Sequence, residues 1–266
     1  MNQVVEVLEN RRTIRKYSDR PIPDDIRDSI IRCAQRAPSG CNFQHYSIIN
    51  ITDKDLQKKL QKNCKNIQTY ISKAPMMLIF CADLQKHQDY WELNDVPKIC
   101  KEKGVAFNSP DACSMFFTMM DAVLAAHTAV IAAESYGIGS CYIGHIVSHI
   151  EDNRKLLNLP KYVFPVIAVL FGYPPEGVHG YQGPRFDRKY MVFDNKYRRL
   201  SKDELDDMFS VRFNNPQPNR FGAENAAQFS YLNRYSGTGV YNEMSRSFNE
   251  IMKTWLSEDN EDQMEN

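Results

Sequence analysis

A long apolar stretch near the middle of the chain restricts the possible folds more than any other feature. Residues 111–135 predict one continuous helix, because apolar side chains recur on both of its faces. Such a helix belongs in a core. His127 within it is then better explained by an interior hydrogen bond than by a ligand. Packing also explains its larger apolar side chains, which are Met115, Phe116, Met119, Met120 and Val123.

Size and charge exclude some classes of protein. The chain has 266 residues, of which 42% are hydrophobic, and this is enough for one large domain or two small ones. Lys and Arg number 33 together, as do Asp and Glu, so no net positive charge attracts nucleic acid. We therefore expect small-molecule partners.

The cysteines and the apolar runs indicate the compartment. Seven cysteines form no CxxC pair, which favours reduced thiols in a reducing compartment. The N-terminus shows no basic-then-apolar signal, and no uninterrupted apolar run approaches the 18 or so residues of a membrane span. We expect a cytoplasmic protein without a membrane partner.

The rest of the chain alternates helical and extended patterns. Helices are expected over residues 4–8, 24–36, 53–64, 148–157, 201–208 and 240–256. Strands are expected over residues 45–52, 75–82, 139–144 and 163–171. Residues 173–200 predict a surface arm, residues 209–239 an irregular stretch, and the last ten residues an acidic, disordered tail.

The glycines of Gly137-Ile-Gly139-Ser-Cys-Tyr-Ile-Gly144 resemble a dinucleotide-binding fingerprint. That fingerprint follows a strand and opens a helix, whereas here a helix precedes the glycines and a strand runs through them. The sequence therefore does not predict a Rossmann domain.

Three guanidinium groups lie within five residues in Arg11-Arg12-Thr13-Ile14-Arg15. Arginine presents a rigid fork of donors that matches a phosphate, so this cluster beside a hydroxyl suits a phosphorylated small molecule. The alternative is a solvated basic face at the end of a helix.

Four segments in this order carry a family resemblance: Arg-Arg-Thr-Ile-Arg, then Ala37-Pro-Ser-Gly-Cys-Asn-Phe-Gln44, then the glycine segment from Ala133 to Gly144, then Gly183-Pro-Arg185. Together they resemble the FMN-dependent nitroreductase family, and most of all its oxygen-insensitive, major-type nitroreductase and NADPH-flavin oxidoreductase branch. The resemblance implies an α+β fold with a mostly antiparallel central sheet flanked by helices, and an extended C-terminal arm. It also implies a domain over residues 1–200, an extension over 201–256 that packs on a dimer partner, and the tail over 257–266.

The same resemblance implies a site for FMN at the interface of a homodimer. Arg11, Arg12, Thr13 and Arg15 would meet the phosphate and ribityl chain, and Arg185 would approach the same phosphate. The partner subunit would contribute a loop, and other residues would reach the ring or the ribityl chain. The loop residues are Ser39, Gly40, Cys41, Asn42 and Gln44, and the others are Gln68, Tyr142, Ile143 and Gly144.

Two positions depart from the pattern of that branch. Gly183 stands where a basic residue is common, so phosphate binding would depend on Arg185 or recruit Arg188 or Lys189. Where the branch presents an arginine pair for the 2′-phosphate of NADPH, only Arg234 matches, which leaves the choice between NADPH and NADH open.

The implied activity is hydride transfer from NAD(P)H, as co-substrate, through the flavin to nitroaromatics, quinones or free flavin in a ping-pong cycle. No catalytic side chain and no metal are required. Two alternatives are an FMN storage or sensor protein without turnover and an enzyme of the same fold with other chemistry, such as a reductive dehalogenase.

An excess of apolar side chains also favours an obligate homodimer. The helix over residues 111–135 and a C-terminal set of aromatics both need cover, and an arm that wraps a partner would supply it. The set comprises Phe229, Tyr231, Tyr235, Tyr241, Phe248 and Trp255. The alternative is that these aromatics fold back on their own chain.

Overall fold

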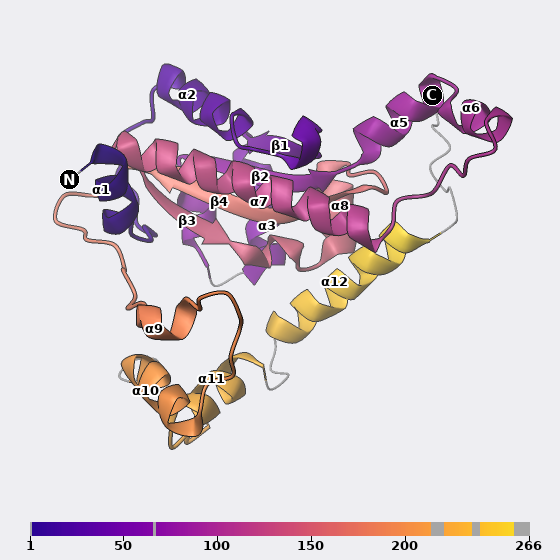
Figure 1. Ribbon diagram of the computed structural model, residues 1–266. Helices are drawn as coiled ribbons and strands as arrows, with labels where there is room; N and C mark the ends of the chain where they lie inside the picture. The colour runs from indigo at the N-terminus through magenta and orange to yellow at the C-terminus, as the bar shows by residue number, and fades with distance from the viewer. Residues whose placement is uncertain (1, 66–67, 214–220, 236–239, 258–266) are drawn as a thin grey trace. The chain divides into compact units, whose positions relative to one another are not determined.

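A computed structural model of the chain describes residues 2–65, 68–213, 221–235 and 240–257 (Figure 1). The chain divides into two compact units, one formed by residues 1–181 with 243–266 and the other by residues 182–242. Each unit is described by itself below. The acidic tail expected from residue 257 falls outside the described residues, apart from Ser257.

The first unit is built on a four-stranded antiparallel sheet in the order β1-β2-β4-β3. Its strands are β1 (Tyr46–Ile51), β2 (Met76–Asp83), β3 (Gly139–Ile143) and β4 (Val163–Gly172). All eight residues of β2 are buried, as its continuous apolar run predicts for a central strand. The expected α+β class with an antiparallel sheet is confirmed.

Helices cover both faces of the sheet (Figure 1). Successive side chains of β2 alternate between these faces, as in any strand. Leu78 and Phe80 face the cluster formed with α2 and α7, whereas Met77 and Ile79 face the cluster with α3 and α4. The helices of this unit, with two 3₁₀ turns η1 and η2, are α1 (Gln3–Asn10), α2 (Asp24–Gln35), η1 (Gly40–Asn42), α3 (Lys54–Lys65), α4 (Tyr70–Lys73), α5 (Gln85–Leu93), α6 (Val96–Glu102), α7 (Ala112–Ser135), η2 (Gly144–Val147), α8 (Ile150–Leu157) and α12 (Val240–Leu256), which begins in the second unit.

The long helix α7 lies against the sheet along a stripe of alanines. Small side chains allow its backbone to lie close to the strands, and the alanines are all buried at 0% exposure. They are Ala122, Ala125, Ala126, Ala129 and Ala133. Asp111 and Ser114 form a capping box that fixes where the helix begins.

The opposite face of the first half of α7 is apolar and exposed. By length and composition alone α7 is also the one described helix that could cross a membrane, but half of its apolar window is buried within the protein, as in a core helix. The expectation of interior packing is thus correct for Met115 and wrong for the exposed side chains within this chain. Those side chains are Phe116 at 60%, Phe117 at 50%, Met120 at 43%, Val123 at 49% and Leu124 at 39%.

The end of α12 packs on its own chain. Trp255 is 1% exposed, lies edge-on to Tyr162 and Phe164, and donates from Nε1 to the Asp111 carbonyl at 3.1 Å. The sequence expectation that Trp255 needs cover from a partner is therefore wrong. Tyr231 and Tyr235 remain more than half exposed.

The second unit contains three helices among its described residues: α9 (Arg188–Met191), α10 (Lys202–Phe213) and α11 (Ala226–Arg234). The sequence predicts α10 but ends it five residues early. It misses α11, which starts where the Asn225 side chain accepts from the Gln228 amide and lies in a stretch expected to be irregular. Residues 214–220 and 236–239 of that stretch are outside the described part of the chain.

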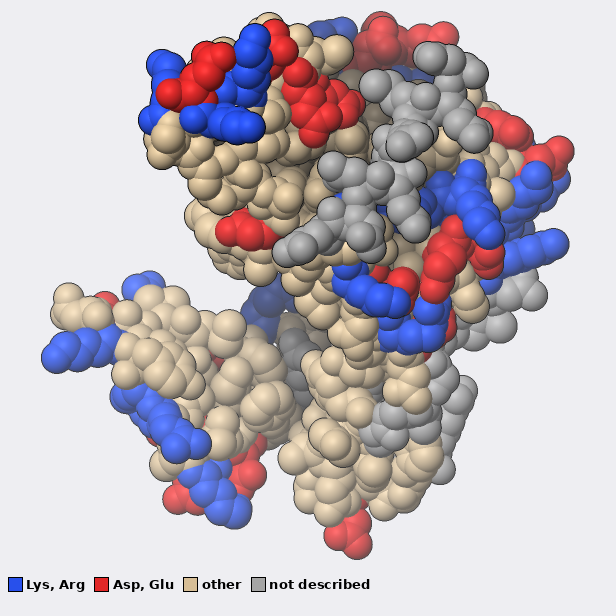
Figure 2. All heavy atoms as spheres, turned by 90° about the vertical axis from the view of Figure 1, so that its right-hand side faces the viewer, with Lys and Arg blue, Asp and Glu red and all other residues tan. Residues whose placement is uncertain are grey.

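Charges of both signs lie next to one another on the face drawn in Figure 2. Arg246 shows the pattern, because it pairs with both Glu151 and Glu243.

Candidate functional site

Residues 11–15, called here the arginine segment, run as an extended strand along the outer edge of β3. Thr13 bridges Ser140 in parallel and Tyr181 in antiparallel sense. The Ile14 amide donates to the Ser140 carbonyl at 2.9 Å, and the Thr13 amide donates to the Tyr181 carbonyl at 3.0 Å. The segment is therefore fixed by backbone hydrogen bonds on both sides, although the sequence gives no hint of this pairing.

Two glycines make room for the arginine segment. A Cβ on Gly139 would lie 2.2 Å from Ile14 Cγ1, and a Cβ on Gly180 would lie 2.7 Å from the Thr13 carbonyl oxygen. No real Cβ tolerates such distances, so the close passage of the segment depends on glycine at both places.

The three guanidinium groups differ in their surroundings. Arg11 is half-buried and donates to Ser140 Oγ at 3.4 Å, while that hydroxyl donates to Glu134 Oε1 at 3.1 Å. Burial raises the pKa of Glu134 to about 7, and the Ser140 hydrogen bond and the charge of Arg11 oppose that rise. Arg12 and Arg15 are exposed, and Arg15 lies 5.9 Å from the centroid of the Tyr70 ring.

Among the described residues, no carboxylate forms an ion pair with any of these three arginines. A solvated face of mixed charge carries such pairs, as α10 does with Lys202 and Asp206. An unneutralised cluster on a rigid backbone instead suits a bound anion such as a phosphate.

Gln68 lies two residues before Tyr70, the ring that Arg15 approaches. Its Oε1 is buried without a hydrogen-bond partner among the described residues. Buried carbonyl oxygens are normally satisfied, so this atom calls for a donor. FMN carries hydroxyl donors on its ribityl chain and N–H donors on its ring, and so the residues present fit this cofactor.

The end of β3 presents the next predicted contacts. Ile143 is buried, and Tyr142 is half-buried with its hydroxyl 3.1 Å from His127 Nδ1. Burial raises the pKa of Tyr142 to about 12. β3 is an edge strand, and the arginine segment pairs with it only at Ser140. The outer backbone groups of β3 near Gly144 can therefore face a ligand. His127 does form a hydrogen bond, as expected, but its side chain is exposed and not interior.

Residues 39–45, called here the 39–45 loop, form a tight turn between α2 and β1. Three of its residues other than glycine have positive φ angles: Cys41 at 49°, Asn42 at 58° and Gln44 at 55°. Ser39 Oγ accepts from the Gln44 amide at 3.1 Å. Such backbone is uncommon for these residue types and clusters at functional sites.

The side chain of Asp121 on α7 holds this loop. Its Oδ1 accepts from the Gly40 amide at 3.0 Å, and its Oδ2 accepts from the His45 amide at 3.1 Å. Sequence reasoning missed Asp121, although a lone carboxylate in an otherwise apolar stretch of α7 was a usable signal.

Aromatic rings pack behind the loop. His45 stacks on Phe43 with centroids 5.3 Å apart and meets His87 of α5 edge-on at 4.4 Å. Burial lowers the pKa of both histidines, and the contact with His87 adds to the effect on His45. His45 Nε2 and His87 Nδ1 are buried without a hydrogen-bond partner in the described part of the chain.

Two predicted residues belong to the second unit. Arg185 is exposed and donates to the Gly183 carbonyl at 3.0 Å, and Arg234 is the last residue of α11, with its side chain outside the described residues. Lys189, the suggested substitute for a missing cation, pairs with Asp207 at 3.0 Å.

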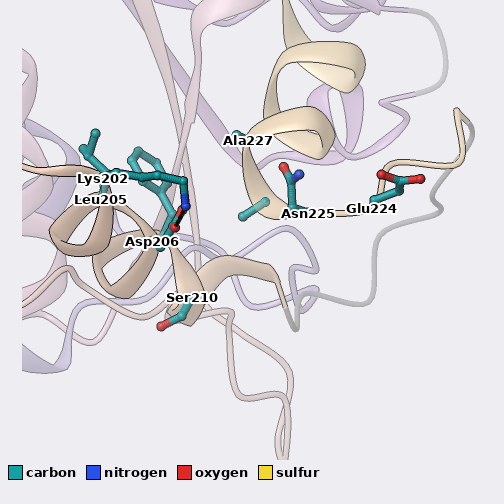
Figure 3. Close-up of a pocket in the computed structure, with 9 residues that line it drawn as sticks. Lys202, Leu205, Asp206, Ser210, Glu224, Asn225 and Ala227 are labelled. Carbon is teal, nitrogen blue, oxygen red and sulfur yellow. Dashed lines mark hydrogen bonds and ion pairs between the residues drawn. The ribbon is translucent and has the colours of Figure 1, made fainter.

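The second unit also has a hollow of about 700 Å³ between α10 and the start of α11 (Figure 3). Lys202 and Asp206 form an ion pair on one wall, and Glu224 and Asn225 lie on the other. None of the residues predicted for the cofactor or for NAD(P)H lines this hollow.

Comparisons with known proteins show what this chain is similar to. The sequence model described as the Nitroreductase family matches residues 8–173. An FMN reductase [NAD(P)H] of Bacillus subtilis is 34% identical over 206 residues, which are 77% of this chain and 78% of the relative. An oxygen-insensitive NADPH nitroreductase of Salmonella typhimurium is 31% identical over 77% of this chain and 79% of its own. The solved structure of the hypothetical oxidoreductase YcnD from Bacillus subtilis superposes with a TM-score of 0.77, 28% identity, and coverage of 94% of this chain and 98% of that one.

Proposed function

This chain belongs to the nitroreductase family, and we propose that it holds FMN against β3 and passes hydride from NAD(P)H to nitroaromatics, quinones or free flavin. It is an enzyme, an NAD(P)H-dependent nitroreductase or flavin reductase. The observation that carries the proposed site is the cluster of Arg11, Arg12 and Arg15, which is held rigidly on both sides and lacks a carboxylate partner among the described residues.

The protein's own residues bind the FMN and orient it. Arg11, Arg12 and Arg15 supply charge-assisted hydrogen bonds to the phosphate, and Thr13 adds a hydroxyl. The Gln68 carbonyl accepts from the cofactor, and the outer backbone of Tyr142 to Gly144 lies along the ring. When bound, FMN supplies the redox chemistry, so no side chain of the chain needs to act as acid, base or nucleophile.

Arg185 and Arg234 complete the proposal from the second unit. Arg185 contributes a further cation for the phosphate, with Arg188 as its substitute, because the ion pair with Asp207 engages Lys189. Arg234 contacts NAD(P)H. The protein works in the cytoplasm, which agrees with its unpaired cysteines.

The proposal includes a homodimer in which each site uses both chains. Within one chain, the 39–45 loop is tied to Asp121 and the arginine segment, through Ser140, to Glu134. These two helix positions are 134 − 121 = 13 residues apart, or about 20 Å at 1.5 Å per residue. A partner whose α7 runs antiparallel brings its loop to the other chain's arginines.

The exposed apolar face of α7, from Phe116 to Leu124, gives such a partner a surface to cover. The assignment of residues 201–256 to an extension that packs on the partner is part of this proposal. It applies to the exposed Tyr231 and Tyr235 and not to Trp255.

The visible spectrum of the purified protein tests the cofactor. We expect oxidised flavin bands that NADPH bleaches within seconds under nitrogen, and an Arg12→Ala protein that leaves purification without colour. Bands that NADPH does not bleach would support the alternative of storage or sensing, and a narrow range of acceptors would support a same-fold enzyme of other chemistry.

Co-refolding of two inactive variants tests the shared site. Gly40→Trp puts a bulky side chain into the loop at a position where a Cβ meets nothing within 4 Å. A heterodimer of Gly40→Trp with Arg12→Ala has one site with both lesions and one with neither if each site uses both chains. About half of the heterodimer's sites should then be active, whereas no activity in a sample shown by mass to contain heterodimer would mean that one chain holds each FMN.

A further inference from the structure

We propose that Asp121 is a positioning residue for the flavin site, because its carboxylate holds the 39–45 loop in the shape that meets the cofactor. This inference rests on the proposed function. It concerns a residue that touches neither the arginine segment nor, in the proposed arrangement, the FMN itself.

Asp121 holds the 39–45 loop at two points. The side chain is 3% exposed, and its two oxygens accept from backbone amides at opposite ends of the loop, Gly40 at 3.0 Å and His45 at 3.1 Å. A carboxylate is acceptor-only and has two oxygens, so aspartate can satisfy both amides at once. An asparagine would present one oxygen and turn its NH₂ group toward the second N–H.

The loop needs this support because its backbone conformation is unfavourable. Cys41, Asn42 and Gln44 all have positive φ angles. Conformations of this kind persist only where the surroundings over-determine them. The bonds from the Phe43 amide to the Gly40 carbonyl and from the Gln44 amide to Ser39 Oγ run within the loop and shape it. At its His45 end the loop is also fixed by the Asp83 amide, which donates to the His45 carbonyl at 3.2 Å, so Asp121 supplies the anchor at the Gly40 end.

A buried carboxylate at position 121 is also a poor choice for the stability of the fold alone. It lies between Met120 and Ala122 on a helix whose other sheet-facing residues in that turn are alanines. Burying a carboxylate there is unfavourable unless its hydrogen bonds achieve something that an apolar residue cannot. Preforming a loop before the cofactor arrives lowers the ordering entropy of binding.

The test compares Asp121→Asn with Thr118→Val, a matched control. Thr118 is fully buried on the same helix, and its hydroxyl donates only to its own Met115 carbonyl. We expect Asp121→Asn to raise the FMN dissociation constant of the apoprotein, measured by quenching of flavin fluorescence, about tenfold or more through the lost bond and the clashing amide. Thr118→Val should leave it within about twofold.

Two further readouts separate positioning from general destabilisation. Asp121→Asn loaded with saturating FMN should show an altered visible circular dichroism of the flavin, whereas a lower melting temperature with unchanged affinity and unchanged dichroism would overturn the proposal. If Asp121→Asn does not fold, residue-resolved hydrogen exchange of the wild-type apoprotein, measured by NMR, decides. The Gly40 and His45 amides should be protected more than that of Cys41, and equal fast exchange at all three would refute the proposed role of Asp121. A wild-type protein that binds no FMN would instead refute the proposed function.

Discussion

The two segments proposed to hold FMN are fixed in opposite ways. The arginine segment is extended, lies between β3 and Tyr181, and passes so close to Gly139 that no Cβ fits there. The 39–45 loop is turned back on itself, leaves open space at Gly40, and is tied to α7 by one side chain. The first is rigid because the sheet continues into it, and the second because the Asp121 carboxylate holds both of its ends, with one further bond from the Asp83 amide to the His45 carbonyl. Added bulk should therefore disturb the fold beside the first segment and leave it intact at Gly40 of the second.

The largest effect is expected from a glycine-to-alanine change made once in β3 beside the arginine segment and once within the 39–45 loop. Gly139→Ala places a Cβ 2.2 Å from Ile14 Cγ1, and overpacking of this severity costs about 3 kcal/mol of unfolding free energy. Gly40→Ala adds a Cβ with nothing within 4 Å and should change that free energy by less than about 0.5 kcal/mol. Urea unfolding of both apoproteins measures the difference, and similar midpoints would erase the contrast.

Arg12→Ala should affect only the cofactor. The loss of a charge-assisted hydrogen bond to phosphate should weaken FMN binding by about 1.5 to 3 kcal/mol, while the melting temperature of the apoprotein hardly moves. Titration of apoprotein with FMN measures this. Lys16→Ala, which removes the neighbouring exposed cation, is the control. Equal affinity of Arg12→Ala and the parent would reduce the segment to a solvated basic face.

The arginine segment should lose stability as the pH rises. Burial raises the pKa of Glu134 from 4.5 to about 7, so the folded protein keeps a proton that the unfolded chain releases between these values. The unfolding free energy of the apoprotein should therefore fall by about 1 kcal/mol from pH 4.5 to 7, with allowance for partial exposure of the group. Glu134→Gln should abolish that slope in denaturant titrations, and an unchanged slope would assign it to another group.

The 39–45 loop should respond to pH in the opposite direction. Burial lowers the pKa of His45 and His87 below 6.5, so as the pH falls below that value the unfolded chain takes up protons before the folded protein does. The loss of unfolding free energy should stay under about 1 kcal/mol, given the exposure of both rings. His87→Phe keeps the edge-on ring contact and should shrink the loss. A variant with the parent's full acid sensitivity would point away from this pair.

Cys41→Ser should have the smallest effect. Cys41 is exposed in the 39–45 loop. We expect it not to act as a nucleophile, so the variant should keep NAD(P)H-dependent quinone reduction within about threefold of the parent. Loss of more than about a hundredfold with FMN still bound would require a thiol step in the mechanism.

The sequence predicts those parts of the fold whose pattern is long and periodic. The strands around residues 46–51, 76–83 and 163–172 and the helix α7 lie within a few residues of their predicted positions. Helices α5, α6 and α11 were missed or unassigned because each is short, and α11 has only nine residues. Its N-cap, Asn225, was a visible but weak signal.

The residues of the proposed site can be read from the sequence, whereas the contacts that support them cannot. The chemistry of Arg11, Arg12 and Arg15 is local, so the sequence shows it directly. The bonds that position them join residues more than 120 apart, as between Arg11 and Ser140, and depend on the register of β3. Asp121 could be identified as a lone charge in an apolar helix, but its two partners follow only from the folded loop.

The pairing of Thr13 and Ile14 with Ser140 also protects the edge of β3 from pairing with strands of other chains. An uncovered strand edge offers unpaired N–H and C=O groups to any other chain. By lying along the outer side of β3, the arginine segment closes part of that edge, so the residues proposed to recognise the cofactor also block strand-to-strand association there. A molecule that has been clipped within its first fifteen residues would therefore be vulnerable in a second way, through aggregation at the exposed edge of β3.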